Sequence, residues 1–404
     1  MKYVFNVSFL IFILYPLTAL GFDSAEEILR TSAINNGFQP PEFLNIKTNP
    51  ALSEIGSQLF ASKQLSLNGK TSCQACHLDE FGSSDGIPNS IGIGGQGMGS
   101  ERILSGGAII PRNSLALWGT GGKNFNVLFW DGRVDFSSKK KISQFGDHPP
   151  SLDPLVVATH LPPLVIREML QEDEFIKNNK KESLSSAEAV YIQIIKNIRN
   201  KEPKLLKDLS EQLKIPGTDV TFTHVAIAIS EFIRTKFALK KTKFHKFVFD
   251  REPLTDTEFK GAMLFYGKGK CATCHSGPYL SDFEFHALAA PQLGFGSNGF
   301  GIDYGRFNIT HNVTDLYKFR TPTLFNVTKT APYGHSGSIM NIDKMITVHF
   351  DPLNEIDTKS LTKNERIELY KRLTAASKDI LLIATLSKKD VAQIREFLTT
   401  LSFE

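Results

Sequence analysis

The spacing of apolar residues predicts a chain that folds mainly into helices. Apolar side chains recur at i, i+3 and i+4 over residues 187–198 and 222–237, which is the period of an amphipathic helix. The strict alternation of apolar and polar residues that marks a half-buried strand is scarce along the chain. The predicted fold class is therefore all-α, with long irregular loops between the helices.

Several of the expected helices begin with a capping signal. Asn49 followed by Pro50 combines an N-cap residue with proline at the first helical position, and predicts a helix through Phe60. A shorter helix is expected over residues 24–35. Three later helices are predicted by Ser/Thr-x-x-Glu/Asp capping boxes, which begin at Thr255, Thr362 and Ser387. The last of these helices is expected to bury Val391, Ile394, Phe397 and Leu401.

A glycine-rich segment interrupts the helical pattern in the first third of the chain. Nine of the 26 residues from Gly82 to Gly107 are glycine, which predicts a long, mobile loop rather than part of the core. Residues 92–97 superficially resemble a nucleotide-binding loop. They follow no apolar strand and open no helix, so a nucleotide site is not expected there.

All four cysteines of the chain fall in two copies of the pattern C-x-x-C-H. The copies are Cys73-Gln-Ala-Cys76-His77 and Cys271-Ala-Thr-Cys274-His275. This pattern attaches c-type haem: the two thiols bond to the porphyrin and the histidine binds the iron. A dithiol redox pair and a four-cysteine zinc site are the alternatives. Neither explains a histidine directly after both pairs, so the sequence predicts two covalently bound haem c groups.

The segments that lead into the two motifs are similar. Residues 54–60 and residues 258–265 are both expected to be helical, and both end in Leu-Phe shortly before the cysteines. This similarity indicates an internal duplication, although ordinary core packing would also explain the apolar ends. The predicted division is an N-terminal cytochrome c-like domain over residues 22–250, with a helical insertion, and a C-terminal cytochrome c-like domain over residues 251–404.

Composition and the N-terminus indicate the compartment. The chain of 404 residues is 41% hydrophobic and 22% charged, as expected of a globular protein with a large core. Its formal charge of +4 would be balanced by the four propionates of two haems, and no nucleic-acid partner is predicted. Lys2, an apolar run and Ala19-Leu20-Gly21 predict a signal peptide over residues 1–21 and a periplasmic protein. An uncleaved membrane anchor is the alternative.

The order of several motifs resembles the bacterial di-haem cytochrome c peroxidases and MauG-like enzymes. The resemblance extends over about residues 51–401. Besides the two haem motifs, it rests on Arg112-Asn113, Phe129-Trp130-Asp131-Gly132-Arg133, Gly305-Arg306, Phe319-Arg320-Thr321-Pro322-Thr323-Leu324 and Ala331-Pro332-Tyr333-Gly334-His335-Ser336-Gly337. It implies two cytochrome c-like domains, of which the first carries a peroxide-reactive haem and the second an electron-transfer haem.

The resemblance also implies which residues bind the two irons. His77 is expected as the proximal ligand of the reactive haem and His275 as that of the transfer haem. The second axial ligand of the transfer haem is expected fourteen residues after His335, which is His349. Met345 precedes His349 by one helical turn and is the rival ligand. A bis-histidine haem should have a lower reduction potential than a Met/His haem.

Three further roles are implied by matching positions in the family. Trp118 is expected to relay electrons between the haems, with plain core packing as the alternative. A calcium ion is expected between the domains, bound partly by the backbone carbonyls of Thr330 and Pro332. Arg306 is expected to bind a haem propionate, since a guanidinium suits a carboxylate. The arginine that the family usually has after Thr-Pro-Thr-Leu is replaced by Phe325.

The sequence departs from the family where peroxide should react. Ile93 stands where a histidine caps the resting iron, which predicts an open first haem, as in MauG. The distal glutamine and glutamate are replaced by Leu128 and Ser138. Candidates to replace them are the acids Asp131, Asp135 and Glu101 with Arg102 or Arg133. Asp131 and Arg133 form a structural pair in the alternative interpretation.

The predicted function is that of a di-haem peroxidase-like oxidoreductase. It would reduce hydrogen peroxide, or use peroxide to oxidise a redox protein or another protein substrate. A small donor such as a cytochrome c or a cupredoxin is the expected partner, and a homodimer is one expected assembly. The alternative function is a non-catalytic di-haem electron carrier or redox sensor, which would keep the fold without the peroxide chemistry.

Overall fold

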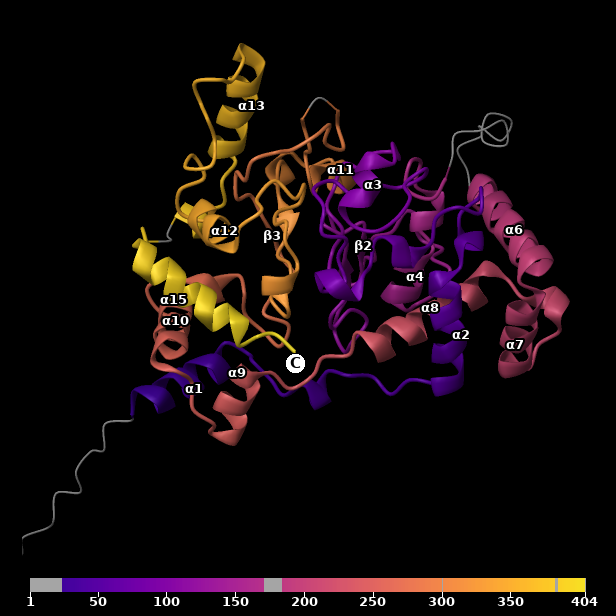
Figure 1. Ribbon diagram of the computed structural model, residues 1–404, viewed down its shortest axis with the longest axis horizontal. Coiled ribbons are helices and arrows are strands. Elements are labelled where there is room, and N and C mark those ends of the chain that lie inside the picture. Colours follow the sequence, from indigo (N-terminus) through magenta and orange to yellow (C-terminus); the bar gives the residue numbers. More distant parts are fainter. Residues whose placement is uncertain (1–23, 171–183, 300, 382–383, 404) are drawn as a thin grey trace, which may run out of the picture.

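The computed structural model describes residues 24–170, 184–299, 301–381 and 384–403. The predicted signal peptide lies outside these residues. The described chain forms two helical lobes, with α2, α4, α6, α7 and α8 on the right of Figure 1 and α1, α9, α10, α12 and α15 on the left. Irregular segments and two short pairs of strands lie between the lobes. The all-α prediction is confirmed.

The described helices and strands have the following bounds. The helices of the first half are α1 (Ala25–Asn35), α2 (Pro50–Ala61), α3 (Ser100–Leu104), α4 (Pro154–Thr159), α6 (Leu184–Lys201), α7 (Pro203–Leu213) and α8 (Phe222–Lys236). Those of the second half are α9 (Lys243–His245), α10 (Asp256–Tyr266), α11 (Phe307–Thr310), α12 (Ile342–Val348), α13 (Lys363–Thr374), α14 (Lys378–Leu381) and α15 (Lys388–Thr399). The strands form two antiparallel pairs, β1 (Val127–Leu128) with β2 (Val134–Asp135) and β3 (Phe285–His286) with β4 (Phe319–Arg320).

The same helix pairing occurs once in each lobe. α2 packs on α8, and α10 packs on α15. A Cβ atom at Gly56 of α2 would lie 1.9 Å from the carbonyl oxygen of Ala228, and one at Gly261 of α10 would lie 1.9 Å from that of Gln393. Only glycine allows two helices to approach so closely, and each glycine precedes the phenylalanine of the Leu-Phe pair by four residues. The structure therefore supports the internal duplication.

The capping signals correctly predicted the residues at which four helices begin. Asn49 caps α2 through hydrogen bonds from the backbone N–H groups of Ala51 and Leu52. All three expected capping boxes form, at the starts of α10, α13 and α15. The predicted stripe of α15 is buried in the core at Val391, Ile394, Phe397 and Leu401. Capping predicts these ends well because it depends on residues within one turn of each other.

The glycine-rich segment is irregular, as expected, but part of it belongs to the core. Ile87 and Ile91 are buried, and α3 lies within the segment. Buried Arg102 donates hydrogen bonds to the backbone oxygens of Ile91 (2.6 Å) and Gly92 (3.2 Å). The expectation of a loop outside the core is therefore wrong, because the arginine and the two isoleucines hold the segment against the lobe.

The lobes do not follow the sequence in two uninterrupted blocks. α1 packs against α10 and against the π-helical turn at Lys246–Asp250. The Nε atom of Arg30 in α1 donates to the backbone oxygen of Phe247 at 2.9 Å. α1 and this turn, which both precede residue 251, thus pack together with α10 of the second half of the chain. The predicted division into two haem domains with a boundary at residue 250 stays a prediction.

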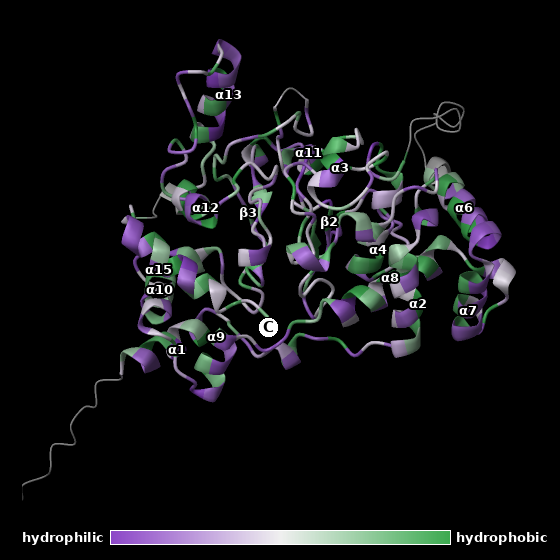
Figure 2. Ribbon diagram, in the orientation of Figure 1, coloured by the Kyte–Doolittle hydropathy of each residue, from purple (hydrophilic) through white to green (hydrophobic). Residues whose placement is uncertain are grey.

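Hydropathy agrees with this arrangement. In Figure 2, hydrophobic residues of α2, α4 and α8 lie where these helices meet, and hydrophilic residues cover the outer end of the projecting helix α13. Among the described residues, no helix is long and apolar enough to cross a membrane.

Candidate functional site

The first cysteine motif folds so that one nitrogen of its histidine is left free. Residues Cys73–Ala75 form a 3-10 turn, and the backbone N–H of His77 donates to the oxygen of Cys73 at 3.2 Å. The Nδ1 atom of His77 lies 2.9 Å from the backbone oxygen of Ser83. Burial lowers the pKa of His77, so the ring is neutral and donates through Nδ1. Nε2 is then free to bind a metal.

The second motif repeats this geometry. Residues Cys271–Thr273 form a 3-10 turn, and the N–H of His275 donates to the oxygen of Cys271 at 2.9 Å. The Nδ1 atom of His275 lies 3.1 Å from the backbone oxygen of Leu280. Burial, and after it the neighbouring His349, lower the pKa of His275 to about 4. This imidazole is also neutral, with Nε2 available.

His349 faces His275 at a separation that suits two ligands of one iron. The ring centroids are 6.3 Å apart. Two imidazoles that each bind one metal through a bond of about 2 Å would place their centroids roughly 6 Å apart. His349 lies at the end of α12, and its Nδ1 is 2.8 Å from the backbone oxygen of Met345, which leaves its Nε2 free. The Met345 side chain also lines this cavity and packs against a small apolar cluster.

The cavity around His275 offers a site for the negative charge of a haem. Its largely apolar wall includes Cys271, Cys274 and Arg320. Arg320 is 4% exposed and donates to the backbone oxygens of Phe129 and Thr321, both at 3.1 Å. Burial lowers its pKa to about 10, and no carboxylate forms an ion pair with it in the described part of the chain. A propionate would supply the missing partner of this buried cation.

Arg306, the predicted propionate ligand, already forms hydrogen bonds and an ion pair within the protein. Its Nη1 donates to the backbone oxygens of Asp131 (2.9 Å) and Gly132 (2.7 Å), and its Nη2 pairs with Asp135 at 2.8 Å. These contacts tie Arg306 to the β1–β2 hairpin. Arg320 is therefore the better-placed propionate ligand, and the sequence did not single it out.

Asp131 and Arg133, predicted as catalytic, belong to a buried ion network. Arg112 donates to Asp131 at 2.6 Å and, through two nitrogens, to Asp303 at 2.7 and 2.9 Å. Arg133 donates to both oxygens of Asp131, at 3.0 and 2.8 Å. Burial alone would raise the pKa of Asp131, but the two arginines lower it far below its usual range. Asp131 therefore stays ionised and has no proton to give, which favours the structural interpretation of this pair.

The other candidates for the distal acid are also unsuited to the role. Ser138 is exposed and donates to the backbone oxygen of Lys140 at 2.8 Å. Glu101 is exposed and accepts from the backbone N–H of Met98 at 3.1 Å. Asp135 accepts from Ser137 and Arg306. Leu128 is buried in β1 and carries no ionisable group.

Trp118 lies where the two lobes meet. Its ring contacts Phe237 at 5.6 Å between centroids and Phe403, near the end of the chain, at 4.7 Å. The residues just before it, from Asn113 to Ala116, line the cavity of His275. The next residue, Leu117, donates its N–H to Ser83 in the loop that binds His77. The indole is thus packed between the two motifs, which suits both the relay and the packing interpretation.

The predicted calcium carbonyls lie beside a side chain that the sequence did not identify. Nδ2 of Asn113 is 2.6 Å from the backbone oxygen of Pro332, and its Oδ1 is buried without a partner. Rotating the amide by half a turn would bring Oδ1 to the Pro332 oxygen, and two such oxygens suit calcium. Thr330 lies two residues away. Calcium takes about six to eight oxygen ligands, so these positions alone do not complete a site and the calcium ion stays a prediction. In the sequence, Asn113 appeared only as part of the Arg112-Asn113 motif, and no function was predicted for it.

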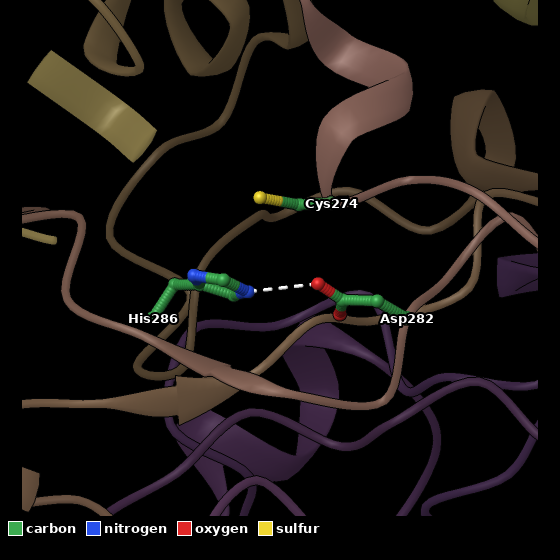
Figure 3. Close-up of side chains that lie close together, drawn as sticks. All are labelled: Cys274, Asp282 and His286. Atoms are coloured by element: carbon green, nitrogen blue, oxygen red, sulfur yellow. Dashed lines mark hydrogen bonds and ion pairs between the residues drawn. The ribbon is translucent and has the colours of Figure 1, made fainter. Parts of the chain in front are cut away.

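A second side-chain cluster adjoins the second motif. Cys274, Asp282 and His286 lie close together, and Nε2 of His286 is 2.8 Å from Asp282 (Figure 3). The contacts of His286 with Asp282 and Cys274 raise its pKa to about 10. A thiol, a carboxylate and an imidazole could bind a metal ion, but haem attachment would convert the Cys274 sulfur into a thioether. The arrangement therefore fits a charged pair beside the haem better than a separate metal site.

Comparison with known proteins decides the family. The sequence profile of the family described as di-haem cytochrome c peroxidase matches residues 50–252. The chain belongs to this family. Its membership makes it a peroxidase-type oxidoreductase, and the two C-x-x-C pairs are consistent with the two haem sites of the family.

Individual relatives of the di-haem peroxidase family are distant. The chain is 26% identical over 330 residues to the cytochrome-c peroxidase IdrP1 of Pseudomonas sp. (strain SCT), with 74% of this chain and 73% of that protein covered. It is 24% identical over 320 residues to the methylamine utilization protein MauG of Methylorubrum extorquens, covering 78% and 74%. The crystal structure of a MauG-like protein associated with microbial copper homeostasis superposes with a TM-score of 0.64 at 23% identity, covering 91% and 93%. At this level of identity, the structural comparison shows a similar fold.

Proposed function

We propose that this protein is a periplasmic di-haem enzyme that reduces hydrogen peroxide, or uses it to oxidise a protein substrate. Cys73 and Cys76 would attach the peroxide-reactive haem and His77 would bind its iron. Cys271 and Cys274 would attach the electron-transfer haem, whose axial ligands would be His275 and His349. When bound, the two haems supply the electrons that reduce peroxide.

One observation carries the proposal, namely that the two motifs differ in their axial donors. His275 has a second buried histidine facing it at 6.3 Å between ring centroids. The ring contact of His77 is with Phe60, at 6.2 Å, and no second histidine ring faces it within the described ranges. One iron with two histidines and one with a free coordination position suit a division between electron transfer and peroxide binding.

Further features of the sequence support the proposed compartment, the open first haem, the electron donor and the calcium ion. The predicted signal peptide and the haem motifs support a periplasmic location, because c-type haem is attached outside the bacterial cytoplasm. Ile93 cannot bind iron, which supports a first haem that is open without prior reduction. A small cytochrome c or cupredoxin would deliver electrons, or a protein substrate would be oxidised directly. The carbonyls of Thr330 and Pro332, with the amide of Asn113, would bind the calcium ion.

Electron paramagnetic resonance of the oxidised, as-isolated holoprotein tests this assignment. We expect one high-spin ferric signal, from the His77 haem, beside one low-spin signal from the bis-histidine haem. Two low-spin signals would mean that both irons carry two protein ligands. They would favour the second candidate, a di-haem electron carrier, for which the absence of the distal pair at Leu128 and Ser138 is the supporting observation.

Trp118 provides a test of the electron path. Replacing it with phenylalanine keeps the aromatic contacts with Phe237 and Phe403 but removes the more easily oxidised indole. We expect slower electron transfer between the haems after flash reduction, with unchanged haem content and unchanged spectra of the resting protein. An unchanged transfer rate in Trp118→Phe would leave Trp118 with a packing role only.

A further inference from the structure

The side chain of Trp118 is held by packing rather than by hydrogen bonds. Trp118 is half-buried, and its buried Nε1 atom makes no hydrogen bond among the described residues. The backbone on either side of it is fixed. The N–H of Leu117 donates to Oγ of Ser83 at 2.8 Å, and the N–H of Gly119 donates to the backbone oxygen of Phe237, also at 2.8 Å. The orientation of the indole therefore depends on the groups that pack against it.

Each lobe provides one aromatic ring that packs against this indole. Phe237, just after α8, meets the indole edge-on at 5.6 Å between ring centroids. Phe403 lies closer, at 4.7 Å, with an angle of 52° between the rings. In Figure 1, the chain after α15 runs towards the junction of the lobes, which is how Phe403 reaches Trp118. The Nζ atom of Lys240 is 5.9 Å from the indole, but this side chain is exposed. Phe403 thus brings the lobe of α15 into contact with Trp118.

Hydrogen bonds fix the backbone of Phe403 to a loop of the second haem cavity. Its N–H donates to Oδ1 of Asn326 at 2.8 Å, and its backbone oxygen accepts from Nζ of Lys329 at 3.1 Å. Between these two residues lies Val327, which lines the cavity of His275. The ring of Phe403 is therefore held at a set position relative to this cavity.

A second phenylalanine packs against the ring of Phe403. Phe325 is buried and lies nearly parallel to Phe403, at 5.8 Å between centroids and an angle of 16°. Buried His245 lies on Phe325 in the same way, at 5.6 Å and 9°. Phe325 stands where the family usually has an arginine, whose charge would be costly among these rings without a partner. In this chain, an aromatic ring at that position supports Phe403.

We propose that Phe403 is a positioning residue for electron transfer through Trp118, and that Phe325 supports it. This inference rests on the proposed function, in which Trp118 relays electrons between the haems. The indole passes one electron at a time and ends unchanged, so the haem that gives the electron is oxidised and the haem that receives it is reduced. Electron transfer slows steeply as the gap between two groups widens. A ring that keeps the indole from turning or shifting therefore maintains the rate.

Flash reduction of the holoprotein tests this role. Phe403→Leu keeps an apolar side chain but removes the ring, and we expect electron transfer between the haems to slow about tenfold, because small displacements of reacting groups have large effects on rates. Phe403→Tyr, which keeps the ring, should retain most of the rate. The matched control is Phe43→Leu, at a phenylalanine that is 58% exposed, and it should leave the rate unchanged. Haem content and circular dichroism establish that each variant is folded.

A double variant separates positioning from general support of the fold. If Phe403 acts through the indole, adding Phe403→Leu to Trp118→Phe should cause no further loss of rate. Ultraviolet resonance Raman spectroscopy provides a second readout. The chain has two tryptophans, so the signal that disappears in Trp118→Phe belongs to Trp118. This signal should shift in Phe403→Leu and stay unchanged in Phe43→Leu.

The outcomes distinguish this inference from the proposed function. If the wild-type protein does not react with peroxide, the proposed function fails, while flash reduction still measures the effect of Phe403. If Trp118→Phe transfers electrons as fast as wild type, the relay fails and the role of Phe403 fails with it. If Trp118→Phe slows transfer but Phe403→Leu does not, or if the two losses multiply in the double variant, the positioning role is overturned and the relay stands. Should Phe403→Leu not fold, Phe325→Leu replaces it and should slow transfer only when Trp118 is present.

Discussion

Replacing Arg112 with methionine should lower the free energy of unfolding by about 3–5 kcal/mol. Arg112 is buried and pairs with two buried acids, Asp131 and Asp303, which come from distant parts of the chain. Without it, Asp303 loses both of its hydrogen bonds from a cation and, among the described residues, keeps those from Ser297 and the backbone N–H of Gly305. An uncompensated buried charge is costly because the interior solvates it poorly. Chemical denaturation followed by circular dichroism measures the loss.

The pH dependence of this loss identifies its cause. Arg112 lowers the pKa of Asp303, and with Arg133 that of Asp131, against the opposing effect of burial. A depressed pKa in the folded state contributes stability that is present above the unfolded value and is lost as the pH falls. The difference between wild type and Arg112→Met should therefore be largest above about pH 5 and shrink on further acidification.

An exposed ion pair provides the control for this prediction. Lys260 and Asp256 pair at 2.6 Å on the surface of α10, where both side chains are more than half exposed. Lys260→Met should change the free energy of unfolding by less than about 1 kcal/mol. If Arg112→Met lowered the free energy of unfolding by as little as Lys260→Met, the buried ion network would contribute little to the stability of the contacts between these parts of the chain.

Replacing His349 with methionine should raise the reduction potential of the electron-transfer haem. A thioether stabilises the reduced iron relative to imidazole, and axial ligands set haem potentials over a range of about 0.8 V. We expect a rise on the order of 100 mV, together with the long-wavelength absorption of a sulfur-bound ferric haem. Spectroelectrochemical titration of the holoprotein measures both.

The rival assignment makes the opposite prediction. If Met345 were the ligand, Met345→Leu would change the potential and spectrum of the second haem, while His349→Met would leave them close to wild type. With His349 as ligand, Met345→Leu should affect only the packing around Ala290, Tyr333, Ile339 and Val348. The two variants together therefore assign the ligand.

Local sequence signals predicted the helical part of the fold well. Helix starts at Asn49, Thr255, Thr362 and Ser387 depend on side chains within one turn, so they can be read without knowledge of the tertiary structure. The haem motifs were equally accessible because each is contained in five residues. The position of α1 was not, because its packing against α10 joins segments more than two hundred residues apart.

The buried polar contacts of Arg112 and Asn113 could not be derived from the sequence, because they too join distant segments of the chain. Arg112 meets Asp303 across 191 positions of the chain, and Asn113 meets Pro332 across 219. Arg320 stands out because it is buried and forms no ion pair with a carboxylate in the described part of the chain. Such contacts are properties of the folded chain rather than of any local pattern.

The most direct test of the central claim is rapid mixing of the fully oxidised, as-isolated protein with one equivalent of hydrogen peroxide. We expect an immediate shift of the Soret band without prior reduction, because isoleucine, which stands at the expected capping position (Ile93), cannot bind iron. A reaction that requires prior one-electron reduction would show that a ligand closes this iron at rest. An unchanged spectrum in both forms would contradict the peroxidase assignment itself.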